Sequence, residues 1–331
     1  MTPLVSVVTP VFNTARYLAE CIESVLAQDH DNFEYIIADN CSTDESLAIA
    51  QRYAAMDSRI RVLAHAEFLD QDANYNRALG YISPESRYVK IAQADDILMP
   101  QCLTAMTSLA GLHPSVGITG CCFVTGDALA GQGLPFDRNF FTGAEACRTR
   151  LLDGGTYFGS PTCLLYRADI VRARPAFFGA NESNADTVAC FEILACADFA
   201  RVPQILCRLR RGNPSVSDAL HRNGAASFLN YALVERFGPR YLNAAELEER
   251  RRILRDGYLR LLARAVPVRN NGPFWQFHRD ALATLGQTLP RAAVAWRFID
   301  YLLQKILNPR QTVELAIDAL RASGSRKRDR E

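Results

Sequence analysis

Two adjacent carboxylates, Asp95 and Asp96, follow an apolar run over residues 88–92. Such a run is typical of a buried strand, so the pair would leave the end of that strand together. A hard cation such as Mg²⁺ or Mn²⁺ prefers oxygen ligands, and it commonly takes one or two protein carboxylates while phosphates and water complete its shell. The pair therefore predicts a place that holds a divalent cation and a diphosphate. The alternative is that it caps the helix expected from Pro100.

Two motifs upstream also place polar residues where a strand ends. The first, VSVVTPVFN, carries Pro10, Phe12 and Asn13 where an apolar run breaks into a loop. The second, IIADNCSTDES, places Asp39 after another apolar run, and residues 42–45 fit a capping box that opens a helix. Taken alone, Phe12 would equally suit a core position, and Asp39 would equally serve to order its turn.

The elements that must position these residues alternate between short apolar runs and helical spacing. We expect strands over residues 4–8, 33–38, 59–64, 88–92 and 116–124, with helices from 14, 42, 72 and 100 between them. This alternation is typical of a mostly parallel sheet covered on both faces, which binds ligands at the carboxyl ends of its strands. The fold class predicted is therefore α/β.

The second half of the chain gives a looser pattern. We expect a helix over 143–152, a strand over 162–166, a helix over 185–197 and a strand over 205–209. From about residue 221, long amphipathic segments over 244–266 and 291–307 predict a helical region. The predicted domains are residues 1–220, an α/β domain, and 221–322, a helical accessory region, followed by a disordered tail over 323–331.

Composition excludes several other classes of protein. The 331 residues are 49% hydrophobic and 22% charged, which is ordinary for a globular chain. No apolar run has the length of a membrane span and no leader segment is evident, so we expect a cytoplasmic protein. The ten cysteines form no CxxC pair and are expected to be reduced, and the five histidines lack metal-ligand spacing. We expect no nucleic-acid partner.

Charge is distributed unevenly along the chain. The formal net charge is +1, yet residues 222–331 carry 20 Lys and Arg against 11 Asp and Glu, and residues 1–221 carry 17 against 25. A basic excess spread along helices is usually a solvated face, and the alternative is contact with an anionic surface.

The three motifs, in this order and spacing, resemble those of family-2 glycosyltransferases, which are inverting enzymes of the GT-A fold that use nucleotide-diphosphate sugars. The resemblance covers about residues 3–210. It implies a nucleotide site that includes Pro10, Phe12, Asn13, Asp39, Asn76 and Asp95. In this scheme Asp39 favours a uridine base, Asp95 reaches the ribose, and Asp96 binds Mn²⁺ or Mg²⁺ under the diphosphate. A structural hydrogen bond is an equally good account of Asn76.

The resemblance also implies a catalytic base and an acceptor region. Asp186, at the start of an expected helix, is the candidate base, with Glu182 as runner-up and a capping role as the alternative. Aromatic rings stack on sugars, so Tyr157 and Phe158, with Ser160, are the candidate acceptor contacts, and packing within the domain is the alternative. The late strand leads into Arg208, Arg210 and Arg211, which suit a phosphate clamp or a solvated surface.

One departure from the family pattern concerns the metal. Relatives often carry an additional Asp two places before the pair, and Gln93 stands there in this chain. We expect this to weaken cation binding in the absence of nucleotide. A catalytically degenerate scaffold that binds or assembles is therefore the alternative function. A nucleotide-cofactor oxidoreductase is disfavoured because no GxGxxG follows the first strand.

The resemblance further implies the partners. They are a nucleotide-sugar donor and a glycan or lipid-linked acceptor in cell-surface polysaccharide synthesis. Three roles are open for the C-terminal helices: packing on the α/β domain, formation of a homodimer, or peripheral contact with the inner face of the membrane, which their basic excess motivates.

Overall fold

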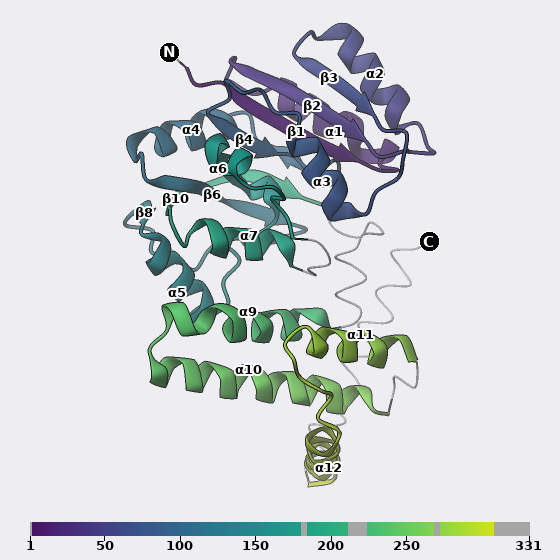
Figure 1. Cartoon of the computed structure of the whole chain (residues 1–331), viewed down its shortest axis with the longest axis vertical. Coiled ribbons are helices and arrows are strands. Elements are labelled where there is room, and N and C mark those ends of the chain that lie inside the picture. Colours follow the sequence, from purple (N-terminus) through teal and green to yellow (C-terminus); the bar gives the residue numbers. More distant parts are fainter. Residues whose placement is uncertain (1, 180–183, 211–223, 268–271, 308–331) are drawn as a thin grey trace. The chain divides into compact units, whose positions relative to one another are not determined.

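The computed structural model describes residues 2–179, 184–210, 224–267 and 272–307 (Figure 1). The chain divides into two compact units. One comprises Met1–Asp218 together with Arg236–Glu246, and the other comprises Ala219–Glu235 together with Leu247–Glu331. The predicted tail over 323–331, like Glu182 and Arg211, lies outside the described residues.

A single mixed sheet forms the centre of the first unit. Its strand order is β3-β2-β1-β4-β9-β6-β10-β5; in addition, β7 pairs with β6 and β8 pairs with β10. The strands are β1 (Val5–Val11), β2 (Phe33–Asp39), β3 (Ile60–Ala64), β4 (Tyr88–Ile91), β5 (Ile97–Leu98), β6 (Val116–Thr125), β7 (Ala128–Ala130), β8 (Phe140–Phe141), β9 (Leu164–Arg167) and β10 (Asp198–Leu209).

Strands β1 to β4 are parallel, which matches the alternation in the sequence. All seven residues of β1 are buried, as expected of a strand covered on both faces. Strand β9 departs from the alternation because it lies between β4 and β6 and is antiparallel to both. The fold is the predicted α/β class, with helices on either side of the sheet (Figure 1).

Helices pack against the sheet through regularly spaced apolar residues. In α1 the buried residues Leu18, Cys21, Ile22 and Val25 follow the spacing of one helical face, and they share a core with β1, β2, α2 and α4. The helices of this unit are α1 (Ala15–Leu26), α2 (Ser46–Met56), α3 (Gln71–Leu79), α4 (Cys102–Leu112), α5 (Gly143–Asp153), α6 (Ala168–Ala173) and α7 (Ala185–Ile193), with the short 3₁₀ helix η1 (Pro161–Cys163).

The C-terminal region is helical, as predicted. It contains α9 (Ala225–Tyr241), α10 (Ala244–Ala265), α11 (Gly272–Ala283) and α12 (Arg291–Leu307). In the second unit a small core gathers around Phe228, Tyr258, Leu262 and Phe274. None of the helices in the described ranges has both the length and the hydrophobicity that crossing a membrane requires.

Candidate active site

The loop after β1 is held by the loop after β2. Asn13 adopts a positive φ of 51°, and its Oδ1 accepts a hydrogen bond from the Thr43 amide at 2.8 Å. In return the Asn13 amide donates to Ser42 Oγ at 3.0 Å. Phe12 is 43% exposed and its ring lies 4.9 Å from that of Phe68, whereas Pro10 is buried within β1. The core alternative for Phe12 is therefore wrong, and the ring borders the solvent.

The expected capping box over residues 42–45 is wrong. Helix α2 begins at Ser46, and its N-cap residue Glu45 makes no side-chain cap. The side chains of this turn bind the start of α1 instead, where Asp44 Oδ2 accepts from the Ala15 amide at 3.0 Å and Ser46 Oγ accepts from the Thr14 amide at 2.9 Å. The polar residues of STDES thus fix the position of the β1–α1 loop.

Asp39 ends β2 with only 2% of its surface exposed. Its Oδ2 accepts from the Ser42 amide at 3.1 Å, so the carboxylate does order the turn. Its Oδ1 is buried and has no hydrogen-bond partner among the described residues. A buried carboxylate oxygen without a hydrogen-bond partner destabilises the folded protein unless a bound ligand donates a hydrogen bond to it.

His65 lies beside Asp39 and was missed in the sequence, where it is a lone histidine without metal spacing. Its amide donates to the Asp39 carbonyl at 3.0 Å, and its Nε2 is buried without a partner among the described residues. Burial, followed by the positive charge of Arg77, lowers the pKa of this imidazole. The neutral ring therefore adds a second unsatisfied polar atom near Asp39.

The acidic pair sits in a tight turn after β4, and its two members face different surroundings. Asp96 is 4% exposed: its Oδ2 accepts from Thr162 Oγ1 at 2.6 Å, and its Oδ1 accepts from the Arg210 amide at 3.1 Å. Burial and the charge of Asp95 raise the pKa of Asp96 to about 7, although the bond from Thr162 opposes the rise. Asp96 thus points inward, with partners from η1 and from the chain leaving β10.

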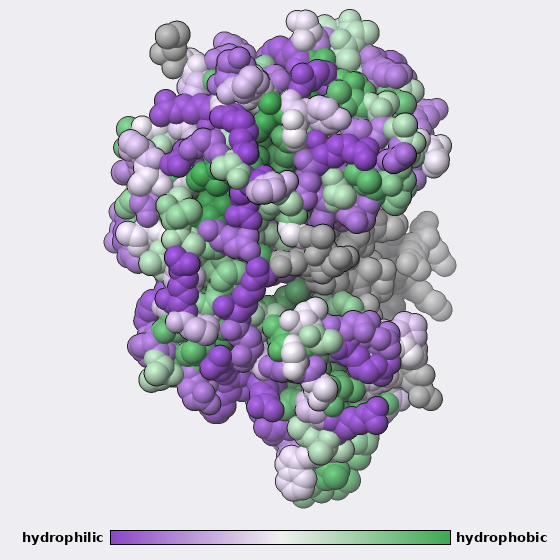
Figure 2. Space-filling view, in the orientation of Figure 1, coloured by the Kyte–Doolittle hydropathy of each residue, from purple (hydrophilic) through white to green (hydrophobic). Residues whose placement is uncertain are grey.

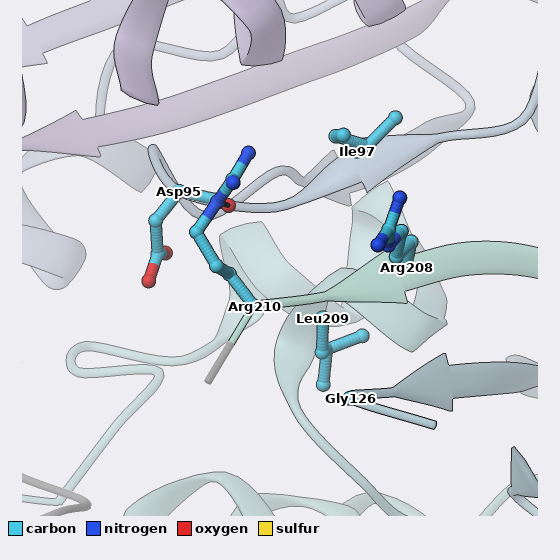
Figure 3. Close-up of a pocket in the computed structure, with 6 residues that line it drawn as sticks. All are labelled: Asp95, Ile97, Gly126, Arg208, Leu209 and Arg210. Atoms are coloured by element: carbon cyan, nitrogen blue, oxygen red, sulfur yellow. Dashed lines mark hydrogen bonds between the residues drawn. The ribbon is translucent and has the colours of Figure 1, made fainter. Parts of the chain in front are cut away.

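Asp95 lines a pocket of about 260 Å³ together with Ile97, Gly126, Arg208, Leu209 and Arg210 (Figure 3). Arg210 Nε donates to the Asp95 carbonyl at 3.1 Å, and its guanidinium lies over Tyr17, 4.6 Å from the ring centroid, while also bonding Glu20. Arg210 therefore braces the acidic turn against α1. Arg208 is exposed at the same pocket, where an anionic group can reach it.

Gln93, the residue that departs from the family pattern, is fixed by hydrogen bonds close to the acidic pair. Its Nε2 donates to Tyr75 Oη at 3.1 Å, its Oε1 accepts from Ser160 Oγ, and its amide donates to Thr162 Oγ1 at 3.2 Å. Thr162 and Tyr75 were both missed in the sequence. Tyr75 stands one residue before Asn76 in ANYNRAL, which was the available signal, while nothing marked Thr162.

Asp186 lies in the first turn of α7, where its Oδ1 accepts from the Thr187 amide at 2.7 Å. Burial raises the pKa of this carboxyl to about 6. The pKa of Tyr75 is raised by burial first, and then by the negative charges of Asp95, Asp96 and Asp186. All three carboxylates are therefore within electrostatic reach of one buried hydroxyl, although they come from elements far apart in the sequence.

Asn76 does not face this group of carboxylates. Its Oδ1 accepts from the Phe177 and Phe178 amides, both at 2.9 Å, and its Nδ2 donates to the Phe178 carbonyl at 2.8 Å. Both ends of the amide are used by the backbone. The prediction of a nucleotide contact needs correction, and the structural alternative describes this side chain.

The predicted acceptor rings also need correction. Tyr157 and Phe158 are 1% and 2% exposed, and Phe158 packs edge-on against Phe191 and Phe199. Neither ring presents a face on which a sugar can stack. Ser160 differs because it joins the network of Gln93 beside the acidic turn.

Solved structures share this fold. The chain aligns with residues 1–349 of S. aureus TarS in complex with UDP-GlcNAc at a TM-score of 0.63 and 16% identity, covering 93% of this chain and 92% of that one. It aligns with the mannosyltransferase PcManGT from Pyrobaculum calidifontis in complex with GDP-Man and Mn²⁺ at 0.55 and 17%, covering 93% and 87%. The architecture is that of the GT-A glycosyltransferases.

The model of glycosyl transferase family 2 matches residues 6–174, and the chain belongs to that family. YibD of Escherichia coli K12, an uncharacterized glycosyltransferase, is 30% identical over 244 residues, 70% of this chain and 67% of that protein. Glycosyltransferase GlyG of Streptococcus pneumoniae serotype 4 is 39% identical over 98 residues, 30% and 32% of the two chains.

A shorter match concerns TuaG of Bacillus subtilis 168, a putative teichuronic acid biosynthesis glycosyltransferase. It is 40% identical over 94 residues, 28% of this chain and 36% of that protein. The matched segments thus span about a third of the length of GlyG and TuaG. The resemblance to family-2 glycosyltransferases inferred from the motifs is confirmed.

Replacing Asn76 with Ala should loosen residues 177–178. The Phe177 and Phe178 amides would lose their acceptor, so we expect their hydrogen exchange to accelerate by about tenfold or more. The exposed Asn32, which donates to the Thr2 carbonyl, gives a matched control, and Asn32→Ala should leave both amides unchanged. Unchanged protection in Asn76→Ala, combined with weaker nucleotide binding, would contradict the structural role.

Proposed function

We propose that this chain is an inverting glycosyltransferase that moves a sugar from a UDP-sugar to a hydroxyl of a glycan or lipid-linked acceptor in cell-surface polysaccharide synthesis. The observation that carries the proposal is the hydrogen-bond network in which Gln93 joins Tyr75 to Thr162 and Thr162 donates to Asp96, beside the pocket that Asp95 lines. The charge of Asp186 also acts on the Tyr75 hydroxyl, whose pKa it helps to raise. A carboxylate pair for the leaving diphosphate and a separate carboxylate for the acceptor are what such a transfer needs.

The nucleotide base binds at Asp39 in this proposal. The orphaned Oδ1 is an acceptor for the imide N–H of uracil, and the exposed ring of Phe12, in the neighbouring loop after β1, offers a flat face. The UDP-GlcNAc complex of TarS, which shares the fold, supports a uridine donor. Asn13 fixes the loop through Ser42 and Thr43, so the base and its carboxylate are held by one hydrogen-bonded unit.

Asp95 and Asp96 would hold the divalent cation, Mn²⁺ or Mg²⁺, beneath the diphosphate. The donor set fits, because two adjacent carboxylates with a raised pKa at Asp96 favour a neighbouring positive charge. In the described part of the chain no three His, Cys, Asp or Glu gather into a metal site, so phosphate and water oxygens would complete the shell. A bound cation compensates the charge of the departing diphosphate.

The two carboxylates differ in access. Asp95 lines the pocket, so we assign it the contact with the donor, whereas Asp96 shares its oxygens with Thr162 and the Arg210 amide. Arg208, exposed at the same pocket, is placed to pair with a phosphate oxygen.

Asp186 acts as the general base. The acceptor oxygen attacks the anomeric carbon, the bond from that carbon to the phosphate oxygen breaks, and the diphosphate leaves with its electron pair. The acceptor proton passes to the Asp186 carboxylate, and attack from the face opposite the phosphate inverts the anomeric centre. Burial makes this carboxylate more basic than an exposed one.

The proposal is tested with a panel of nucleotide sugars, each with Mn²⁺ or with a chelator. We expect UDP-sugars to raise the melting temperature, and slow release of UDP to require the cation. Stabilisation by other nucleotides but not by UDP-sugars would refute the uridine assignment. Metal-independent release would refute the role of the cation.

One observation favours a second candidate, the catalytically degenerate scaffold. Gln93 replaces a carboxylate with a neutral amide that is already bonded to Tyr75 and Ser160. Saturable UDP binding without turnover on any donor, in the presence of either cation, would support this candidate over the enzyme.

Replacing Asp39 with Asn should weaken UDP binding by about tenfold to a hundredfold, because an amide has a single oxygen for the two donors. That oxygen serves either the Ser42 amide or the base, but not both. Calorimetric titration of UDP measures the change, and the exposed Asp31→Asn is the control. An unchanged Kd would remove Asp39 from the base site.

Replacing Asp186 with Asn should reduce transfer by more than about a hundredfold, because the amide has no basic oxygen for the acceptor proton. UDP affinity should remain near that of the unchanged protein. Asp169, in the first turn of α6, is a matched control, since Asp169→Asn alters a helix-start carboxylate without altering the site. Retained turnover in Asp186→Asn would assign that carboxylate to capping alone.

Activity should depend on the ionisation of Asp186. Its pKa is raised to about 6, so below that pH the carboxyl is protonated and cannot accept a proton. With donor and cation both saturating, so that bound cation keeps Asp96 ionised, we expect kcat/KM for the acceptor to fall about tenfold per pH unit below that value and to level off above it. A profile that stays flat down to about pH 4 would contradict the base assignment.

A further inference from the structure

Helix α12 carries its large apolar side chains on the side that faces away from its own unit. Val294 is buried against the small helical core, and Arg297 reaches inward to Asp256. On the opposite face of the helix, spacings of three and four residues align the side chains of Trp296, Ile299, Leu303, Ile306 and Leu307. We call these five residues the α12 stripe.

The α12 stripe is exposed along its whole length. Trp296 is 69% exposed, Ile299 49%, Leu303 51%, Ile306 71% and Leu307 80%. In Figure 2 hydrophobic residues gather over α12, the yellow-green helix seen nearly end-on in Figure 1. Scattered apolar residues are normal on a surface, but a contiguous helical stripe of this kind marks an interaction site.

Positive charge accompanies the stripe. Helix α12 contains Arg291, Arg297 and Lys305 against one acidic residue, Asp300, which lies 3.9 Å from Arg297. Further along the sequence, residues 321–331 carry five Arg or Lys against two acidic residues. A helix with tryptophan and aliphatic residues on one face, and basic residues beside and after it, has the features of a segment that lies in the interface of an anionic membrane.

Charge also distinguishes a lipid surface from a second copy of the chain. Two copies that met through their α12 stripes would bring together regions that each carry 20 basic against 11 acidic residues. Like charges disfavour that contact, whereas anionic headgroups complement it. Trp296 is also suited to the boundary between headgroups and acyl chains, because its ring is apolar and its N–H is polar.

We propose that α12 lies on the surface of an anionic phospholipid bilayer, with the α12 stripe inserted among the acyl chains and the basic residues near the headgroups. The helix lies along the membrane plane, in keeping with its 17 residues and its mixed faces. This inference concerns the second unit and does not depend on the proposed catalytic function.

The test uses the full-length chain and sedimentation with vesicles. One set is phosphatidylcholine alone, and the other contains about 30 mol% phosphatidylglycerol. We expect binding to the anionic vesicles, and we expect it to weaken strongly between about 0.05 M and 0.5 M salt because the Debye length shortens. Equal binding to both sets, or none to the anionic set, would overturn the proposal.

Two variants separate the stripe from general surface hydrophobicity. Leu303→Ser with Ile306→Ser should lower the partition onto anionic vesicles by about tenfold or more. Leu112→Ser removes a side chain with 71% exposure, matching Ile306, from the end of α4, and should leave binding unchanged. Loss of binding in both variants, or in neither, would refute the assignment to α12.

Fluorescence reports directly on insertion. The chain has two tryptophans, so Trp275→Phe leaves Trp296 as the single emitter. A blue shift with anionic vesicles and none with phosphatidylcholine would support insertion of the stripe. A blue shift that appears without lipid as the protein is concentrated, together with a dimer in light scattering, would identify a second copy as the partner and overturn the proposal.

Discussion

The hydrogen bonds that hold Asp96 are the interaction on which the site depends. Its two oxygens are bonded by Thr162, in the short helix before β9, and by the Arg210 amide, at the end of β10. These contacts join the turn after β4 to two segments that follow more than sixty residues later in the sequence. Because both oxygens of Asp96 accept hydrogen bonds inside the protein, its neighbour Asp95 is the carboxylate that lines the pocket. The geometry of the acidic turn is therefore a property of the assembled sheet and not of the motif alone.

Much of the structure of the first half of the chain could be predicted, because its strands and helices are determined by residue spacing within short segments. The parallel strands are continuous apolar runs and α1 has one regular apolar face, so strand and helix positions follow from spacing. Asp39 was predictable because it ends such a run. The sequence gives no comparable signal for Thr162, since its role depends on β9 entering between β4 and β6. The prediction of a capping box in STDES was wrong for a related reason. Asp44 accepts from the Ser46 amide at the start of α2, but Asp44 and Ser46 also bind the backbone at the start of α1, which is distant in the sequence.

The wrong predictions for Tyr157, Phe158 and Asn76 are explained by the tertiary contacts of their side chains. Tyr157 and Phe158 look like a flexible aromatic loop in the sequence, but their rings complete a packed cluster with Phe191 and Phe199 from α7 and β10. Asn76 looks like a ligand contact, but three backbone groups of residues 177–178 already use its amide. In both cases the partner is a distant segment. Residue type indicates what a side chain can bind, whereas tertiary contact decides what it does bind.

The placement of β9 has a consequence for how the chain is made. During synthesis β1 to β4 emerge early, but one edge of β4 pairs only with β9, which ends at Arg167. A nascent chain that stops before that residue presents bare strand backbone to its neighbours, a known route to aggregation. Shortened versions of the N-terminal half should therefore include the whole of β9. The family match, which runs to residue 174, ends beyond β9 but before β10, the strand that pairs with the other edge of β6.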